Sequence, residues 1–565
     1  MSLLGDIAPQ TLDYVGKLTF WLASIPIVII AAHIVSYLLD PLGLRAFPGP
    51  IFARFTSGWL PWIISQNRWS VTVDRLHQKY GTFVRLSPNH VSIAHPAALP
   101  AVYGHGSGAP KAPYYDGFVN FKSRNMFNTL SRSEHARKRR IESHMFSPQS
   151  VRALEGTASV HHGNLVSQWD KLYSYVKQAE GGGAKEGQLG ASVWKVEGGR
   201  VWFDCMPCDL AFGAPFGMIL AAKDTARFAK SVMAGMAAFG TSSKTSEYAF
   251  ETDETPVTKL MAERADLVAT IGWLPEYWQP IVRMLPAFRG GRKSTPQLAG
   301  LAVAAVAKRL SKPDAREDML NRLLNARDED DEPLSREELS AEAAMLIAAG
   351  ADTVANTSCA TTYYLARDQR VQAKLQAELD EALKSVDSVA APYDAIKHLP
   401  YLDAVVNEGL RLHATIGAGL PRVVPEGGLT MLGHTFKEGT WVSVPVYHLH
   451  RDESIWGENA SEFYPERWIE ASGERKKAML DAFAPFSVGP RACIGRNLAL
   501  MQLHKTLATL FYRFSFVLES SDPVRLRSCI RFCSTADSVR NQLPVQDGFA
   551  RKPRRCMIGI RSRKL

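Results

Sequence analysis

The segment that follows Ser335 most constrains the fold. It reads SREELSAEAAMLIAAGADTVANTSCATTYYLARD without an internal proline, and Ser335 with Glu338 forms a capping box typical of a helix N-terminus. The middle of this predicted helix is apolar nearly all round, so we expect it to run through the core. Further helical patterns, with short β-like runs at Phe83–Ser87, His90–Ala94 and Thr440–Val446, predict a mainly α fold with small β-sheets.

The N-terminal region contains an uncharged apolar run from Leu18 to Leu39. At about 1.5 Å rise per residue, a helix of this length spans roughly 33 Å, enough to cross a bilayer core. Trp21 and Tyr37 lie near its two ends, where aromatic rings favour the membrane interface. Because Arg45 and Arg54 follow the run, the positive-inside rule predicts a signal-anchor with the N-terminus across the membrane and the remainder in the cytosol.

A cleaved signal peptide is the alternative interpretation of this run. Such peptides have a basic leader and a shorter apolar segment, whereas the leader here carries Asp6, Asp13 and Lys17 as its charged residues. The sequence therefore predicts a short lumenal N-terminus at residues 1–17, a transmembrane helix at 18–39, a Pro-rich linker at 40–50 and one globular domain at 51–565, with insertions near 180–194 and 524–543.

The formal net charge of +10 first suggests a nucleic-acid partner. The basic residues are spread along the chain, however, with local clusters such as Arg137–Arg140 and Arg551–Arg555, and no nucleic-acid motif accompanies them. Anionic lipid or an acidic protein explains the charge better. Seven unevenly spaced cysteines do not form a disulfide framework and suit a reducing compartment. We interpret the lone CxxC pair, Cys205 and Cys208, as small buried residues rather than a redox or zinc site.

Two polar residues, Asp352 and Thr353, interrupt the apolar middle of the predicted central helix within AGADT. An ionisable side chain in an apolar helix costs free energy unless it is paired, solvated or functional. Gly350 adds to this cost, because glycine destabilises a helix interior by about 0.5–1 kcal/mol relative to alanine. The pattern predicts either a helix opened locally to admit a small ligand beside an acid and an alcohol, or a kinked helix with internally hydrogen-bonded Asp and Thr.

A carboxylate and two arginines predict a second buried feature. Glu408 and Arg411 lie on a helical pattern that starts near Leu402, and Arg467 follows in FYPERW. An i,i+3 ion pair alone is common on surface helices. With Arg467 added, the carboxylate can lie between two guanidinium groups and lock the nearby cysteine segment against the helix.

Cys493 lies within the frame FSVGPRACIG. A metal-binding thiolate needs a rigid loop, backbone N–H donors and small residues that let a flat cofactor approach, and Gly489 and Gly495 meet this need. No three further ligands have the spacing of a zinc site, and a nucleophilic cysteine with a distant histidine base stays open. His135 and Arg139, at i and i+4 of a basic helical pattern, could pair with two ligand carboxylates or belong to a solvated face.

In this order, AGADT, EGLR, FYPERW and FSVGPRACIG resemble the cytochrome P450 superfamily of the microsomal type, from Phe47 to the C-terminus. The resemblance implies the P450 fold behind one transmembrane helix, with haem b bound through Cys493 as the axial thiolate. It implies haem-propionate contacts from Arg491, His135, Arg139 and Arg422, a loop frame from Phe486, Gly489 and Gly495, a structural lock of Glu408, Arg411 and Arg467, and proton delivery by Asp352 and Thr353. His135 departs from the tryptophan that many members have.

Four segments, Pro88–Val119, Met126–Arg140, Asp209–Met218 and Gly548–Ile560, resemble the fungal benzoate para-hydroxylases. This resemblance implies a monooxygenase that converts benzoate, a small aromatic acid, to 4-hydroxybenzoate. A buried carboxylate substrate needs a cation or several hydrogen-bond donors. Five candidates for these partners precede the basic helix: Lys111, Lys122, Arg124, Tyr114 and Tyr115. The alternative for each is that it is an ordinary loop residue.

The same resemblance implies an enzyme of the endoplasmic reticulum membrane that uses O2 and receives NADPH electrons through the FAD and FMN of NADPH-cytochrome P450 reductase. Cytochrome b5 is a further candidate partner. An acidic reductase surface would meet a basic face around Lys138, Arg140 and Arg496. Three alternatives are a P450 acting on another hydrophobic or secondary-metabolite substrate, a haem-thiolate isomerase or dehydratase, and a non-enzymatic membrane haem-binding protein. Asp352 and Thr353 argue against the isomerase or dehydratase, which needs no proton delivery to dioxygen.

Overall fold

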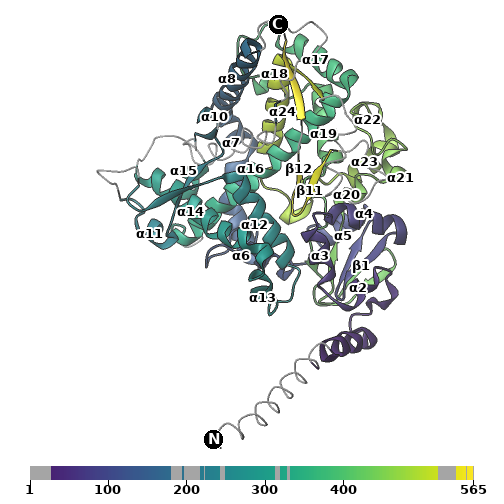
Figure 1. Cartoon of the computed structure of the whole chain (residues 1–565). Helices are drawn as coiled ribbons and strands as arrows, with labels where there is room; N and C mark the ends of the chain where they lie inside the picture. The colour runs from purple at the N-terminus through teal and green to yellow at the C-terminus, as the bar shows by residue number, and fades with distance from the viewer. Residues whose placement is uncertain are drawn as a thin grey trace, which may run out of the picture.

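The computed structural model of the chain describes residues 24, 27–179, 194–195, 217–221, 223–241, 248–311, 319–327, 331–518, 543–554 and 557–563. Helices dominate this part of the chain (Figure 1). The seven longest are α8 (Glu155–Ala179), α12 (Val257–Ile271), α14 (Arg289–Ser311), α16 (Arg336–Arg367), α17 (Gln369–Leu383), α19 (Pro400–His413) and α24 (Arg496–Arg513).

Shorter helices connect and cover the long ones. They are α2 (Ile51–Phe55), α3 (Trp59–Ser65), α4 (Trp69–Tyr80), α5 (Ala98–Tyr103), α6 (Arg132–Ser143), α7 (Pro148–Ala153), α10 (Met218–Ala221), α11 (Val232–Ala237), α13 (Gln279–Arg283), α15 (Met319–Leu324), α18 (Tyr393–Ile396), α20 (Val446–Leu449), α21 (Glu453–Trp456), α22 (Arg467–Glu470) and α23 (Gly473–Ala482). Five 3₁₀ turns complete the set: η1 (Leu44–Ala46), η2 (Pro113–Phe118), η3 (His144–Phe146), η4 (Pro286–Phe288) and η5 (Gly489–Arg491).

The described strands form small sheets, which confirms the predicted mainly α fold with small β-sheets. The largest has the order β1 (Phe83–Ser87), β2 (His90–Ile93), β9 (Trp441–Ser443) and β6 (Arg422–Val423), with β2 and β9 parallel. A three-stranded sheet has the order β10 (Phe514–Leu518), β13 (Met557–Ser562) and β3 (Trp194–Lys195). Three antiparallel pairs remain: β4 (Ala226–Ala229) with β5 (Thr252–Thr255), β7 (Leu429–Met431) with β8 (His434–Phe436), and β11 (Val545–Asp547) with β12 (Arg551–Pro553).

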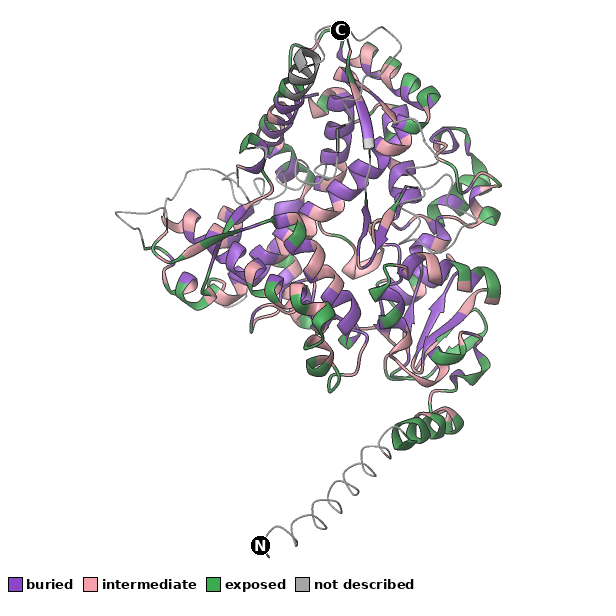
Figure 2. Ribbon diagram, in the orientation of Figure 1, coloured by how far each residue is buried: buried purple, intermediate pink, exposed green. Residues whose placement is uncertain are grey.

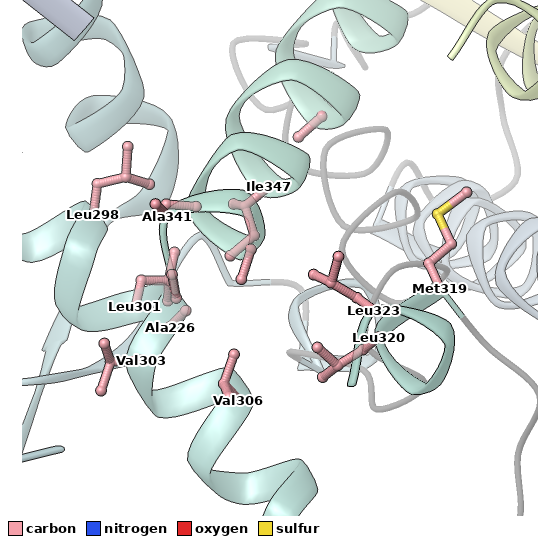
Figure 3. Close-up of a cluster of buried hydrophobic side chains, with 14 of the residues drawn as sticks. Ala226, Leu298, Leu301, Val303, Val306, Met319, Leu320, Leu323, Ala341 and Ile347 are labelled. Atoms are coloured by element: carbon pink, nitrogen blue, oxygen red, sulfur yellow. The ribbon is translucent and has the colours of Figure 1, made fainter. Parts of the chain in front are cut away.

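Helix α16 is the central element, as its all-round apolar pattern predicts. Its N-cap is Ser335, whose hydroxyl accepts a hydrogen bond from the Glu338 N–H at 3.1 Å. Buried residues follow one another along its length (Figure 2). In Figure 3, Ala341 and Ile347 of α16 lie in one apolar cluster with leucines and valines of α14 and with Met319, Leu320 and Leu323 of α15. The helix is continuous through AGADT, so its main chain shows no break there, and the local opening stays a prediction.

The N-terminal prediction falls largely outside the described residues, because residues 1–23, 25 and 26 are not among them. Residues 27–39 are helical, and most of their large apolar side chains are exposed. No helix among the described residues is both long and apolar enough to cross a bilayer. The two predicted insertions, apart from residues 194 and 543, and the pair Cys205 and Cys208 also lie outside the described residues.

Two buried carboxyl groups face each other where α6 packs near α16. Glu142 comes from α6 and Glu342 from α16, and the Lys138 ammonium lies 3.1 Å from a Glu342 oxygen. Burial raises the pKa of Glu142 well above its usual value, and the charge of Glu342 adds to this effect. Burial also raises the pKa of Glu342, against the opposing effect of Lys138. The folded protein therefore holds a proton on this carboxyl pair in conditions where an unfolded chain releases it.

We predict that Glu142→Gln flattens the pH dependence of stability. A carboxyl whose pKa is raised on folding stabilises the protein below the ordinary Glu pKa, and this stability is lost as the pH rises through the raised value. Each unit of raised pKa corresponds to about 1.4 kcal/mol. Melting temperatures measured from about pH 5 to about pH 8 should therefore fall less in the variant than in the wild type.

Glu134→Gln is the matched control on the same helix. The hydrogen bond from Arg137 is the main cause of a lowered Glu134 pKa, so its contribution to stability is lost as the pH falls, not as it rises. An unchanged slope above pH 5 in Glu142→Gln would contradict the shared proton.

Candidate active site

The loop around Cys493 is shaped by glycine and by a main-chain hydrogen bond. The Cys493 N–H donates to the Phe486 carbonyl oxygen at 2.9 Å. Gly489 has φ of +74°, and a Cβ atom there would lie 2.0 Å from the Tyr103 carbonyl oxygen. A side chain at this position would therefore displace the loop. Gly495 is the N-cap of α24, so the thiol lies just before the N-terminus of a long helix.

The surroundings of Cys493 act on its thiol in two directions. The side chain is exposed on the loop, yet the protein atoms around it raise the pKa of the thiol by desolvation. The Gly495 N–H and the guanidinium groups of Arg139 and Arg496 oppose this shift. Coordination to a metal deprotonates a thiol outright. The described residues contain no group of three or more His, Cys, Asp or Glu side chains suited to a metal.

Five basic residues, here called the cation cluster, gather near this loop: Lys111, His135, Arg139, Arg422 and Arg491. The Arg139 guanidinium donates to the Ala492 carbonyl oxygen at 2.8 Å, and that of Arg491 to the Thr129 carbonyl oxygen at 2.7 Å. Arg422 donates to the Tyr115 hydroxyl at 3.0 Å. Within the described residues, none of the five forms an ion pair with a carboxylate.

Burial, and after it the charges of neighbouring members, lowers the pKa values of several residues of the cation cluster. Burial, followed by the charges of Arg491 and other members, lowers the pKa of His135 to about 3. Burial and the charge of Arg422 lower the pKa of Arg491 to about 10. Burial also lowers the pKa of Lys111 well below its usual value, with further contributions from Arg422 and Arg491. Buried cations without counter-ions are costly, so the cluster suits a ligand that carries carboxylates of its own.

These observations fit haem b as the bound group. Cys493 offers one exposed sulfur on a glycine-framed loop, and the cation cluster offers partners for two propionate groups. The structure thus brings together the predicted residues Cys493, Arg491, His135, Arg139 and Arg422, and adds Lys111 and Tyr115, which the sequence suggested for another role.

Asp352 and Thr353 lie side by side in the middle of α16, and both remain partly accessible although the helix runs through the core. The Thr353 hydroxyl donates to the Ala349 carbonyl oxygen at 2.9 Å, within the same helix. The Asp352 carboxylate lies 2.8 Å from the Lys552 ammonium on β12. One further polar contact follows on the helix, because the hydroxyl oxygens of Thr357 and Thr415 lie 2.8 Å apart. An acid and an alcohol are therefore available for proton transfer.

An aromatic cluster lies at the turn of the β11–β12 hairpin. Phe549 of this turn has its ring centroid 4.9 Å from that of Phe118 and 6.1 Å from that of Phe127. Phe118 and Phe127 are 5.3 Å apart. Phe127 and Phe549 are partly accessible. The hairpin that reaches Asp352 thus also presents aromatic faces against which an aromatic ring could pack.

Glu408, Arg411 and Arg467 meet in the interior, and none of their side chains is exposed (0%). Arg411 donates two hydrogen bonds to the Glu408 carboxylate, at 2.9 and 2.8 Å, and Arg467 donates one at 3.1 Å. The Tyr464 N–H and the Trp468 indole N–H each add a bond of 2.9 Å. Burial alone would raise the pKa of Glu408, but the two guanidinium groups outweigh it and hold that pKa below its usual value.

The residues suggested for a substrate carboxylate are only partly brought together: the Lys111 ammonium lies 4.2 Å from the Tyr115 ring centroid, and the Tyr114 and Tyr115 rings are 5.4 Å apart. Lys122 is exposed, and Arg124 forms an ion pair with Asp116 at 2.6 Å. Tyr114 packs against Trp273, with ring centroids 4.8 Å apart. Tyr115 and Lys111 belong with the cation cluster, where the Lys111 ammonium donates to the Phe127 carbonyl oxygen.

The basic face expected for a reductase also needs a correction. Lys138 is buried and forms ion pairs with Glu338 and Glu342, because its position on α6 points it toward α16. Arg140 and Arg496 are exposed. Sequence reasoning missed Lys552 altogether. The basic run Arg551–Arg555 contains it, but no local signal marks which of its members is buried.

Comparison with known proteins shows the family to which the chain belongs. The family model described as Cytochrome P450 matches residues 205–531. Benzoate 4-monooxygenase bphA of Aspergillus niger is 38% identical over 556 residues, which cover 95% of this chain and 96% of that protein. Cytochrome P450 monooxygenase nodW of Hypoxylon pulicicidum is 28% identical over 506 residues, with 89% and 82% covered. Cytochrome P450 monooxygenase ORF11 of Penicillium roqueforti is 29% identical over 488 residues, with 85% and 90% covered. These matches confirm the resemblance that the motifs predict.

We predict that Glu408→Gln prevents accumulation of folded protein. The substitution leaves two buried guanidinium groups without their counter-ion, which costs about 3–5 kcal/mol. Its melting temperature and its yield of soluble, haem-loaded protein should both fall sharply. Glu381→Gln is the control, because Glu381 forms an exposed i,i+3 pair with Lys384 and such pairs contribute little. Equal stability of the two variants would contradict the lock.

Proposed function

This chain belongs to the cytochrome P450 family and is a monooxygenase, and from that premise we propose that its substrate is benzoate or a closely related small aromatic acid, hydroxylated at the para position. The observation that carries the proposal is the 38% identity to a benzoate 4-monooxygenase, which extends over 95% of this chain. The aromatic cluster of Phe118, Phe127 and Phe549 is consistent with a flat aromatic ligand.

Haem supplies, when bound, the iron chemistry by which one atom of dioxygen enters the substrate and the other leaves as water. Cys493 would hold it through its thiolate sulfur, and the cation cluster would neutralise its propionates. Asp352 and Thr353 would carry protons from solvent into the water-poor centre of the protein. The Thr353 hydroxyl, which donates to the Ala349 carbonyl oxygen in the structure, would leave that bond to donate to a group in the site. A proton taken up from solvent by the Asp352 carboxylate would then replace the one that Thr353 gives.

We predict that benzoate added to the purified haem-loaded protein shifts its absorption from low to high spin, and that 4-hydroxybenzoate forms with NADPH and reductase. The same shift should appear with other small aromatic acids and be weaker with a neutral analogue such as benzamide.

Cys493→Ser should abolish two signals: the strongly red-shifted absorption band of the reduced carbon monoxide adduct, and formation of 4-hydroxybenzoate. Repeating turnover at rising ionic strength tests the reductase contact, because attraction between the basic Arg140 and Arg496 and an acidic partner is screened by salt.

Two outcomes of this panel would overturn the substrate proposal. A spin shift with other hydrophobic compounds but with no aromatic acid would favour a P450 of a different substrate class. Binding of aromatic acids without NADPH-dependent product would favour their role as inhibitors. The similarity to named monooxygenases argues against a purely haem-binding role without enzymatic activity.

The cellular location proposed here is the endoplasmic reticulum membrane, with the catalytic domain in the cytosol. Exposed apolar side chains on the helical residues 27–39, on α2 and on α13 support it, including Ile27, Leu39, Phe52 and Ile281. Figure 1 places the helical residues 27–39, α2 and α13 toward the same end of the molecule. Contact with a bilayer would remove these apolar side chains from water, which is favourable.

We predict that the full chain sediments with microsomal membranes and resists extraction by alkaline carbonate. Removal of residues 1–39 should release a large fraction of the protein into the supernatant, while the apolar side chains on α2 and α13 retain some peripheral binding. Protease added to intact microsomes should digest the catalytic domain. A full chain that stays in the supernatant would contradict the anchor, and a protected domain would contradict the orientation.

A further inference from the structure

Lys552 is a buried cation that contacts the proposed acid of the active site. It lies on β12, and its side chain is 2% exposed against 14% for that of Asp352. The ammonium nitrogen lies 2.8 Å from Oδ2 of Asp352, but within the described residues it has no hydrogen bond of good direction. Within this part of the chain, the contact is therefore an ion pair without a hydrogen bond, and the N–H donors of the ammonium group remain available.

The hairpin that carries Lys552 also contacts α12, on the same face. Gln546 of β11 is the cross-strand partner of Lys552, so the two side chains lie on one face of the hairpin. The Gln546 amide donates to both oxygens of Asp266 on α12, at 3.0 and 2.7 Å, and accepts a bond from Arg554. Burial raises the pKa of Asp266, and the charges of Lys552 and Arg554 oppose this. One short hairpin thus bonds to a carboxylate on each of two long helices.

A buried ammonium group needs a counter-ion, and the Asp352 carboxylate is the group at ion-pair distance. The attraction favours orientations of that carboxylate in which one of its oxygens lies near the ammonium group. A general acid or base must lie within hydrogen-bond reach of the proton it transfers. Whatever holds Asp352 in place therefore affects how efficiently protons reach the neighbouring Thr353.

We propose that Lys552 is a positioning residue for Asp352: it holds the carboxylate in the orientation from which protons pass to Thr353. The inference rests on the proton-delivery role proposed above for Asp352 and Thr353. It assigns to the C-terminal hairpin a part in proton supply, besides the aromatic contacts of Phe549. If Lys552 only fastened the hairpin to α16, its loss would lower stability without changing the use of electrons.

The test compares Lys552→Met with Lys552→Arg in the reductase-supplemented full-length enzyme, with benzoate or whichever substrate the panel identifies. Lys552→Met should lower the product formed per NADPH by about threefold or more, the range of coupling between contacting residues, and should change the solvent isotope effect on product formation. The substrate Kd from the spin shift should stay within about twofold. Lys552→Arg, which keeps the charge, should restore most of the product yield. Lys384→Met, which removes an exposed lysine, should change neither quantity.

A double-mutant cycle then isolates the ion pair. In an Asp352→Asn background, Lys552→Met should cause no further loss of product per NADPH, because the group that it positions is already neutral. The cycle also has a readout independent of turnover: Lys552→Met should lower the melting temperature more than Asp352→Asn/Lys552→Met does. If Lys552→Met alone does not accumulate as haem-loaded protein, recovery in the double variant supports the pair and failure to recover overturns it.

Other outcomes separate this inference from the proposed function. If Asp352→Asn uncouples electron use and Lys552→Met does not, the positioning role is wrong and the role of Asp352 stands. If Asp352→Asn and Thr353→Ala leave coupling unchanged, the proposed proton route itself fails. A rise of the benzoate Kd by tenfold or more in Lys552→Met, with a neutral analogue unaffected, would overturn the inference and assign Lys552 to the substrate carboxylate instead.

Discussion

The cysteine loop depends on the buried ion pairs that the Glu408 carboxylate forms with Arg411 and Arg467. Arg411 binds this carboxylate and also donates to the main-chain carbonyl of His450. The His450 ring in turn accepts a hydrogen bond from the Ala484 N–H, two residues before Phe486. A neutralised charge on α19 is thus connected by successive hydrogen bonds to the start of the Cys493 loop. The start of the Cys493 loop is therefore connected to a buried ion pair that lies outside the loop itself.

Three groups of buried charge show how partners distinguish structural from functional sites. Around Glu408 every charge is paired and hydrogen-bonded, so the group is complete within the protein. The cation cluster lacks carboxylate partners among the described residues, and it is complete only with an anionic ligand. Lys552 and Asp352 lie between these cases, because they are paired by distance but not saturated by hydrogen bonds. Buried charge with unused bonding capacity marks the places where chemistry is expected.

Local sequence signals predict the parts of the fold that local physics determines. The capping box at Ser335 predicts the start of α16, and alternating apolar runs predict β1 and β2 nearly to the residue. The family motifs name Glu408, Arg411 and Arg467, and the structure places these three side chains in contact. These succeed because each depends on neighbours within a few positions or on a spacing that the family shares.

Contacts between distant segments were beyond such signals. From the sequence, Lys138 is predicted to lie on a basic surface. In the structure it is buried against Glu338 and Glu342 of α16. In the sequence, Lys552 is one of several basic residues near the C-terminus. In the structure, β12 places its ammonium group beside the Asp352 carboxylate. Burial of a charge is a property of the assembled fold and not of its own helix or strand.

The place of the β11–β12 hairpin in the chain has a consequence for biosynthesis. Gln546 and Lys552 contact carboxylates on α12 and α16, and both come from near the C-terminus. A nascent polypeptide can form most of its helices while still attached to the ribosome, but it cannot complete this centre until translation has nearly finished. Premature termination after Cys493 but before the hairpin would leave a chain that carries the cysteine loop and lacks both Gln546 and Lys552.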